Sequence, residues 1–111
     1  MRLVIAYVQP AMADRVVDAL HRVSGVTGAT FVDARGFGRG RADDPATPEG
    51  IFGTAPRVRV EVAVRAAYAP AVVEAIRTAA YTGRRGDGKI LVLPLDAATR
   101  ISTGEEGDDA V

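Results

Sequence analysis

The chain has 111 residues, of which 48% are hydrophobic, and this is enough to build the core of one domain. Fourteen basic and fourteen acidic side chains give a formal net charge of zero, which offers no overall field to attract nucleic acid or an anionic membrane. The sequence has no cysteine, which excludes disulfides and thiolate nucleophiles. No apolar run approaches the ~20 residues that cross a bilayer and no signal-like leader is seen, so we expect a soluble, cytoplasmic protein of one domain, residues 1–111.

Hydrophobic periodicity predicts a strand, a helix and a second strand in the first third of the chain. Residues 3–8 are continuously apolar, which is typical of a buried strand, and Pro10 ends the run. Residues 11–24 repeat apolar side chains at steps of three and four, which predicts an amphipathic helix. Residues 28–37 alternate as a strand with two aromatic and two polar side chains on one face, for which we expect a subunit contact: Phe31, Asp33, Arg35 and Phe37.

A long loop and a third strand follow. Residues 38–55 contain four glycines, two prolines and five charged residues, a composition that predicts a mobile loop. Loops of this length inside compact domains are usually functional. Valine then alternates with charged residues over 56–64, so this strand has one core face and one charged face.

The last third of the chain repeats the helix–strand order. Residues 70–81 predict a second helix, with Pro70 in its first turn, and residues 90–93 predict a fourth strand. Residues 94–97 are interpreted as a turn or a single helical turn, and 99–102 as a short extended piece. The acidic residues 103–111 are expected to form a frayed C-terminal tail. The order β-α-β-loop-β-α-β predicts an α+β, ferredoxin-like sandwich.

Residues 83–94 combine glycines and cations with the predicted strand 90–93 that follows them, and residues 83–89 are here named the glycine turn. Glycine allows positive φ and lets a bulky anion approach the backbone N–H groups, while arginine and lysine hold phosphate. The pattern therefore indicates a phosphate or nucleotide site, although it matches neither GxGxxG nor GxxxxGKS and a solvated turn is the alternative. The residues concerned are Gly83, Gly86, Gly88, Arg84, Arg85 and Lys89.

Three segments resemble the PII signal-transduction family, in the same order and across nearly the whole chain. The most specific reads TGRRGDGKI at 82–90, with Pro94 four residues on, and is followed by RISTGE at 100–105. The other two segments read RGFGR at 35–39, where the loop begins, and PRVRVE at 56–61, where it ends.

The resemblance implies a homotrimer with an adenine nucleotide (ATP, ADP or AMP, with Mg²⁺ accompanying ATP) in each cleft between subunits. The loop 38–55 would be the T-loop, which contacts a target such as a membrane transporter or a metabolic enzyme, with nitrogen regulation as the family default. The resemblance implies neither a catalytic residue, nor nucleic-acid binding, nor insertion into a membrane. Its implied nucleotide-binding residues are Thr30 and Val64 near the base, Gly36, Phe37 and Gly38 at the rim, Arg39 at the loop, Gly86, Asp87, Gly88 and Lys89 around the phosphates, and Arg100 from the adjoining subunit.

Several positions depart from the family pattern. Gly40 stands where members that sense 2-oxoglutarate have a glutamine that helps to coordinate magnesium, so 2-oxoglutarate sensing is not expected. Arg57 replaces a lysine, and Ser102 replaces a phosphate-binding arginine, which favours ADP or AMP. The loop has no tyrosine, which excludes uridylylation there.

Other classes of function stay open at this stage. A PII-like regulator of carbon, bicarbonate or metal transport that binds ADP or AMP would tolerate Gly40 and Ser102. An RRM-like RNA-binding module shares the strand order, but lacks the basic surface and paired strand aromatics. A small enzyme is a further alternative, but His21 is the one histidine of the sequence and no Ser-His-Asp arrangement can be assembled around it. A site for a hard cation would have to use acidic residues of the loop and the tail: Asp43, Asp44, Glu49, Asp108 and Asp109.

Overall fold

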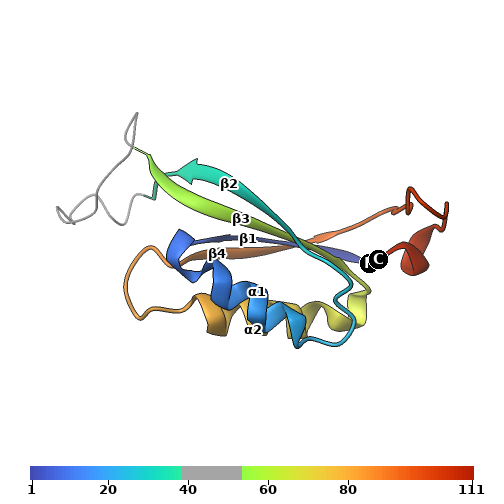
Figure 1. Ribbon diagram of the computed structural model, residues 1–111, viewed down its shortest axis with the longest axis horizontal. Coiled ribbons are helices and arrows are strands. Elements are labelled where there is room, and N and C mark those ends of the chain that lie inside the picture. The colour runs from blue at the N-terminus through green and yellow to red at the C-terminus, as the bar shows by residue number, and fades with distance from the viewer. Residues whose placement is uncertain (39–53) are drawn as a thin grey trace.

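The computed structural model describes residues 1–38 and 54–111 (Figure 1). In chain order the strands and helices of these ranges are β1 (Arg2–Val8), α1 (Ala13–His21), β2 (Thr30–Gly36), β3 (Ala55–Val64), α2 (Ala69–Ala80) and β4 (Gly88–Pro94). Short 3₁₀ helices lead into both α-helices and lie near the C-terminus: η1 (Pro10–Met12), η4 (Ala66–Tyr68) and η5 (Gly107–Ala110).

The four strands form one sheet in the order β2-β3-β1-β4, and all neighbours are antiparallel. Both α-helices cover the same face of the sheet (Figure 1). This is the ferredoxin-like α+β arrangement, so the predicted fold class is confirmed.

The core lies between the sheet and the two helices. Alternate residues of β1 and β3 point toward the helices, because side chains of a strand alternate between its faces. These residues and the apolar stripes of the helices are buried: Val4, Ala6, Val8, Val58, Val60, Val62, Val64, Val16, Leu20, Val72 and Ile76. The alternating pattern of residues 56–64 is thus confirmed.

The opposite face of the sheet carries no helix from residues 1–38 or 54–111, and we call it the open face (Figure 1). In the antiparallel register, directly opposed residues share a face, so the open face carries both apolar and charged side chains. Its members on β1, β3 and β4 include Leu3, Ile5, Tyr7, Arg57, Arg59, Glu61, Lys89, Leu91 and Leu93.

One expectation for β2 is wrong. Phe31 lies opposite Val60, which is buried, and its ring packs against the core of the same chain. The aromatic face of β2 therefore lies on the helix side at this residue and does not need a subunit to cover it there. Phe37 follows the end of the strand and is 75% exposed.

Element boundaries differ from the sequence predictions mainly at β4 and α1. β4 begins at Gly88 instead of residue 90, because the pairing with β1 continues as far as Val8 opposite Gly88. It also runs to Pro94, opposite Arg2, so the single helical turn considered for residues 94–97 does not form. α1 is shorter than residues 11–24 because its first turn is the 3₁₀ helix η1.

The C-terminal residues are not the frayed tail that the sequence predicts. The N–H of Leu95 donates to the carbonyl of Met1 at 3.2 Å, and the N–H of Gly107 donates to the carbonyl of Ala98 at 2.9 Å. Both ends of the chain lie side by side at one end of the sheet (Figure 1). The expected extended piece 99–102 is mostly a turn, in which the N–H of Gly104 donates to the carbonyl of Arg100 at 2.8 Å.

Across residues 1–38 and 54–111, no helix is both long and apolar enough to span a membrane.

Gly88 cannot accept a side chain without movement of the β1–β4 pair. Its φ is +106°, and an added Cβ would lie 1.6 Å from the carbonyl oxygen of Tyr7. Gly88→Ala should therefore lower the free energy of unfolding by roughly 2–4 kcal/mol, since it adds both backbone strain and a clash with a strand. Urea denaturation at one protein concentration measures this loss.

Gly28→Ala is the matched control, because an added Cβ there meets no atom within 4 Å. Its stability should stay within about 0.5 kcal/mol of the wild type. Equal losses in the two variants would contradict this explanation of Gly88.

Candidate functional site

One cavity brings together most of the residues that the sequence predicts for a ligand site. It lies at the end of the sheet where β4 begins, and its volume is about 390 Å³, within the range of small-molecule pockets. Six predicted residues line it: Gly36, Phe37, Gly38, Gly86, Gly88 and Lys89. The remaining lining residues are Tyr7, Ala34, Arg35, Arg57 and Leu91, and the whole is named the cationic cavity.

The charge of this cavity differs from that of the whole chain. Among the described residues that line it, Arg35, Arg57 and Lys89 are cationic and none is acidic. Lys89 lies opposite Tyr7 in the β1–β4 register, which places it on the open face. A chain of zero net charge therefore carries a local site suited to an anion.

The glycine turn is closed by a carboxylate. The backbone N–H of Thr82 donates to Oδ2 of Asp87 at 2.8 Å, and the Thr82 hydroxyl donates to Oδ1 of the same residue. The N–H of Arg84 in turn donates to Oγ1 of Thr82 at 3.2 Å. Positive φ angles of 82° at Gly83 and 87° at Gly86 allow the chain to make this bend. The Asp87 side chain is therefore occupied in shaping the turn.

The same contacts control the ionisation of Asp87. Burial raises the pKa of this carboxyl. Three hydrogen bonds and the positive charge of Arg84 lower it; the donors are the Thr82 hydroxyl, the Thr82 N–H and the Gly83 N–H. The net effect is a pKa below the ordinary value. Asp87 is consequently ionised at neutral pH and remains a strong acceptor for the turn.

Gln9 makes a second contact with the glycine turn that the sequence does not signal. Its Nε2 donates to the carbonyl oxygen of Gly86 at 2.7 Å, across 77 residues of sequence. Tyr7 and Leu91 were also missed as lining residues. The alternation of side chains along a strand places Leu91 on the same face as Lys89, and the β1–β4 register adds Tyr7 to that face.

Two predicted site residues on the strands, Val64 and Thr30, lie away from the cationic cavity. Val64 lies opposite Arg2, at the far end of β1 from Val8 and Gly88, which over six residue steps is ~20 Å away. Its side chain is fully buried, so only its backbone could meet a ligand. Thr30, opposite Glu61, is exposed at the start of the edge strand β2. Arg39 lies outside the described residues.

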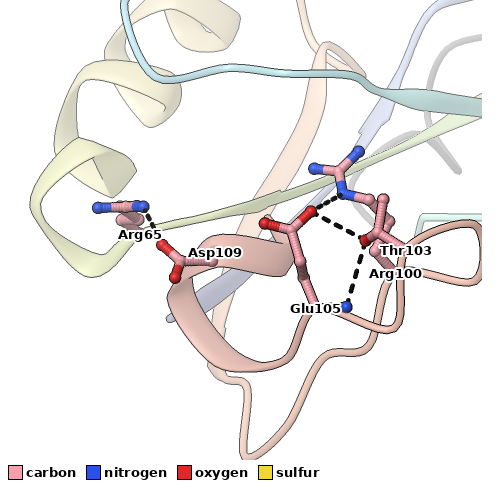
Figure 2. A network of polar contacts seen from close by, with 5 residues as sticks. All are labelled: Arg65, Arg100, Thr103, Glu105 and Asp109. Carbon is pink, nitrogen blue, oxygen red and sulfur yellow. Dashed lines mark hydrogen bonds and ion pairs between the residues drawn. The ribbon is translucent and has the colours of Figure 1, made fainter.

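Arg100 belongs to the C-terminal segment, also at the far end of the sheet (Figure 1). Figure 2 shows its guanidinium beside Glu105, with Nε 3.8 Å from Oε1. Glu105 also accepts a hydrogen bond of 2.9 Å from the Thr103 hydroxyl, and the neighbouring η5 is held by Asp109, 3.0 Å from Arg65. Arg100 is thus held in a segment at the opposite end of the sheet from its own chain's cationic cavity.

The structure offers little to the other classes of function. Within the described ranges, no group of three or more potential ligands could hold a metal ion, and Asp43, Asp44 and Glu49 lie outside these ranges. His21 is exposed on α1, beside a different cavity between α1 and β2. Since Phe31 packs on the core, it cannot pair with Phe37 as a base-stacking platform on the open face.

The fold and the cavity together define a class: a small ferredoxin-like domain with a cationic glycine turn at the end of its sheet. A family model described as nitrogen regulatory protein P-II matches residues 1–105, and the chain belongs to this family. It is 41% identical to nitrogen regulatory protein P-II of Azospirillum brasilense, 43% to that of Rhizobium meliloti and 40% to that of Rhodospirillum rubrum. Each alignment spans 113 positions and all of both chains, so the resemblance found in the sequence is confirmed.

Asp87→Asn tests how the glycine turn is closed. The substitution removes the ionised acceptor of the Thr82 contacts, so at pH 7 the free energy of unfolding should fall by about 1 kcal/mol. The pKa of Asp87 is lower in the folded chain than in the unfolded one. Its contribution is therefore complete above the unfolded-state value of ~3.9 and is lost as the pH falls through the folded-state value.

The difference in stability between wild type and Asp87→Asn should accordingly shrink below about pH 4. Urea denaturation at pH 7, 5, 4 and 3 measures it, with Asp96→Asn as an exposed control that should differ little from the wild type throughout. A difference that stays constant down to pH 3 would argue against this role of the Asp87 charge.

Proposed function

We propose that the chain binds an adenine nucleotide in clefts between the subunits of a homotrimer and signals the number of phosphates through the loop 38–55. As a member of the P-II family with relatives named nitrogen regulatory protein, it is a PII-type regulator of nitrogen signalling. The family is regulatory, and no catalytic role is proposed for any residue. The observation that carries the proposal is the cationic cavity, where a glycine turn and three cations meet.

The lining of the cavity suits the two parts of a nucleotide. Backbone N–H groups of the glycine turn and the ammonium of Lys89 offer donors to phosphate oxygens. Tyr7, Phe37 and Leu91 supply the aromatic and aliphatic surface that a base or ribose needs. The preference for adenine rests on the family resemblance, as does Mg²⁺ with ATP.

A shared site would explain why the predicted residues lie at two ends of the sheet. Arg100 and Val64 lie far from the glycine turn of the same subunit, so they would complete the cavity of a neighbouring copy. Closed rotational symmetry then gives every cleft the same two halves. The half-exposed Leu91 and Leu93 of the open face, 42% and 39% accessible, would be covered by the same assembly.

The open face also carries charge that suits an interior between subunits. Nε of Arg59 lies 2.9 Å from Oε1 of Glu61, which makes an ion pair within one chain, although this buried Nε donates no well-formed hydrogen bond. A paired charge costs less to bury than a single one. We infer that both residues face the centre of the trimer.

Signalling requires that the loop 38–55 contacts the ligand differently in each nucleotide state, because a ligand shifts an equilibrium only through differential affinity. Gly36 and Phe37, directly before the loop, and Gly38, its first residue, line the cavity, which supports contact between the start of the loop and the phosphates. The loop would then bind its target, a membrane transporter or a metabolic enzyme, in one state only.

Gly40 and Ser102 lead us to expect no response to 2-oxoglutarate and a relative preference for ADP or AMP.

Titration calorimetry with ATP, ADP, AMP and 2-oxoglutarate tests the nucleotide site. The wild type should bind the nucleotides and give no added heat with 2-oxoglutarate, in the presence or absence of Mg²⁺ and ATP. Lys89→Ala should weaken ADP binding by about 10- to 100-fold, since it removes a charge-assisted contact with phosphate.

Arg15→Ala is the control for loss of a positive charge, because Arg15 is exposed on α1. It should bind ADP as the wild type does. Undiminished affinity in Lys89→Ala would move the site elsewhere, and a wild type that binds no adenine nucleotide would overturn the proposal.

Subunit mixing tests whether each site draws on two chains. Lys89→Ala and Arg100→Ala should each bind ADP weakly when purified alone, because each lacks one half of every cleft. In trimers co-assembled from equal amounts, about one quarter of the clefts should combine an intact Lys89 with an intact Arg100 of the neighbour. Calorimetric stoichiometry would report this recovery of tight sites. Binding that mixing does not restore would mean that both residues serve one chain's site, or that Arg100 serves none.

A further inference from the structure

The side chain of Gln9, the residue that follows β1, makes a hydrogen bond to the glycine turn. It follows Val8, which forms the last β1–β4 pair with Gly88, so the regular ladder ends directly before it. Gln9 is the N-cap residue of η1, but its side chain makes no capping hydrogen bond there. The part-buried amide instead donates to the carbonyl of Gly86 at 2.7 Å, a short and well-formed bond.

This hydrogen bond fixes the orientation of one peptide plane. In a trans peptide the carbonyl oxygen and the following N–H point in opposite directions. Because the Gly86 oxygen is directed to Gln9, the N–H of Asp87 is directed away from it. The φ of 87° at Gly86 shows that glycine is needed here, and glycine leaves the plane easier to rotate than any other residue would. A rotated plane would turn a carbonyl oxygen, which repels phosphate, to the side where an N–H attracts it.

The contact also differs in kind from the one made by Asp87. The Asp87–Thr82 contacts close the turn upon itself, and they would survive if the turn moved as a unit. Gln9 connects the turn to β1, the strand that carries Tyr7 and pairs with Lys89. It therefore sets where the turn lies relative to the rest of the cationic cavity.

We propose that Gln9 is a positioning residue for the nucleotide phosphates: its amide holds the Gly86–Asp87 peptide with the N–H, not the carbonyl, available to the anion. This inference rests on the proposed function, because it assigns Gln9 a role in the same cavity. Gln9 itself does not touch the ligand in this scheme. Its effect is therefore confined to ligands that carry phosphate.

Two substitutions of similar length separate the hydrogen bond from the bulk of the side chain. Gln9→Met keeps the length but has no donor, and Gln9→Glu presents an acceptor-only carboxylate to the Gly86 carbonyl at neutral pH. We expect Gln9→Met to weaken ADP binding by about 3- to 10-fold and Gln9→Glu to weaken it further. Thr78→Ala is the control, since it removes an exposed hydrogen bond of 3.3 Å to Glu74 on α2 and should leave affinity unchanged.

Adenosine distinguishes a positioning role from a merely structural one. Its affinity, measured by NMR titration, should be the same in wild type and Gln9→Met, because it has no phosphate to meet the turn. The backbone amide resonance of Asp87 should shift on addition of ADP to the wild type and shift less in Gln9→Met. Unfolding midpoints of the variants show whether the fold itself is retained.

The outcomes are distinct. Wild-type ADP affinity in Gln9→Met, or an equal loss of adenosine and ADP binding, would overturn the role of Gln9 and leave the proposed function standing. A wild type that does not bind ADP would overturn the proposed function and this inference with it. A selective loss of ADP binding, with the change in the Asp87 resonance, would support both.

Discussion

The close pairing of β1 with β4 is the constraint on which the candidate site depends. At its end, Gly88 approaches the Tyr7 carbonyl so closely that any side chain would collide with it, and its φ of +106° is one that few other residues adopt. Lys89 is the next residue, and its pairing with Tyr7 in the same ladder decides that its side chain lies on the open face. The position of the cation is therefore decided by backbone packing, and the glycine turn begins from a rigid strand.

Rigidity of the turn comes from hydrogen bonds to groups of two kinds. The carboxylate of Asp87 accepts hydrogen bonds from Thr82, and the pKa of Asp87 is lower than usual. The turn is therefore closed by an ionised acceptor. Gln9 reaches the Gly86 carbonyl from the end of β1. Both contacts satisfy polar groups that a loop of glycines would otherwise leave to water, and preorganised donors bind an anion without reorganisation at the moment of binding.

The residues of the proposed nucleotide site lie at opposite ends of one sheet. Gly88 and Lys89 stand at one end, while Arg100 is held by Glu105 at the other, next to both chain termini. β4 begins at Gly88 and runs to Pro94, toward the end where Arg100 lies, and a rigid sheet cannot fold its own ends together. In the proposed function a neighbouring copy of the chain would supply the missing half, which would link oligomerisation to ligand binding.

The sequence by itself determined the fold class, the six strands and helices and the glycine turn, because period-2 and period-3.6 patterns and glycine chemistry are local properties. It also predicted six of the residues that line the cationic cavity. Only the tertiary structure decided the contacts made across long separations. Gln9 reaches Gly86 through 77 residues, Phe31 turns to the core because of its register with Val60, and an acidic C-terminus is ordered by Arg65 and the backbone of Ala98. These contacts follow from strand pairing and chain return, which no local pattern of residues encodes.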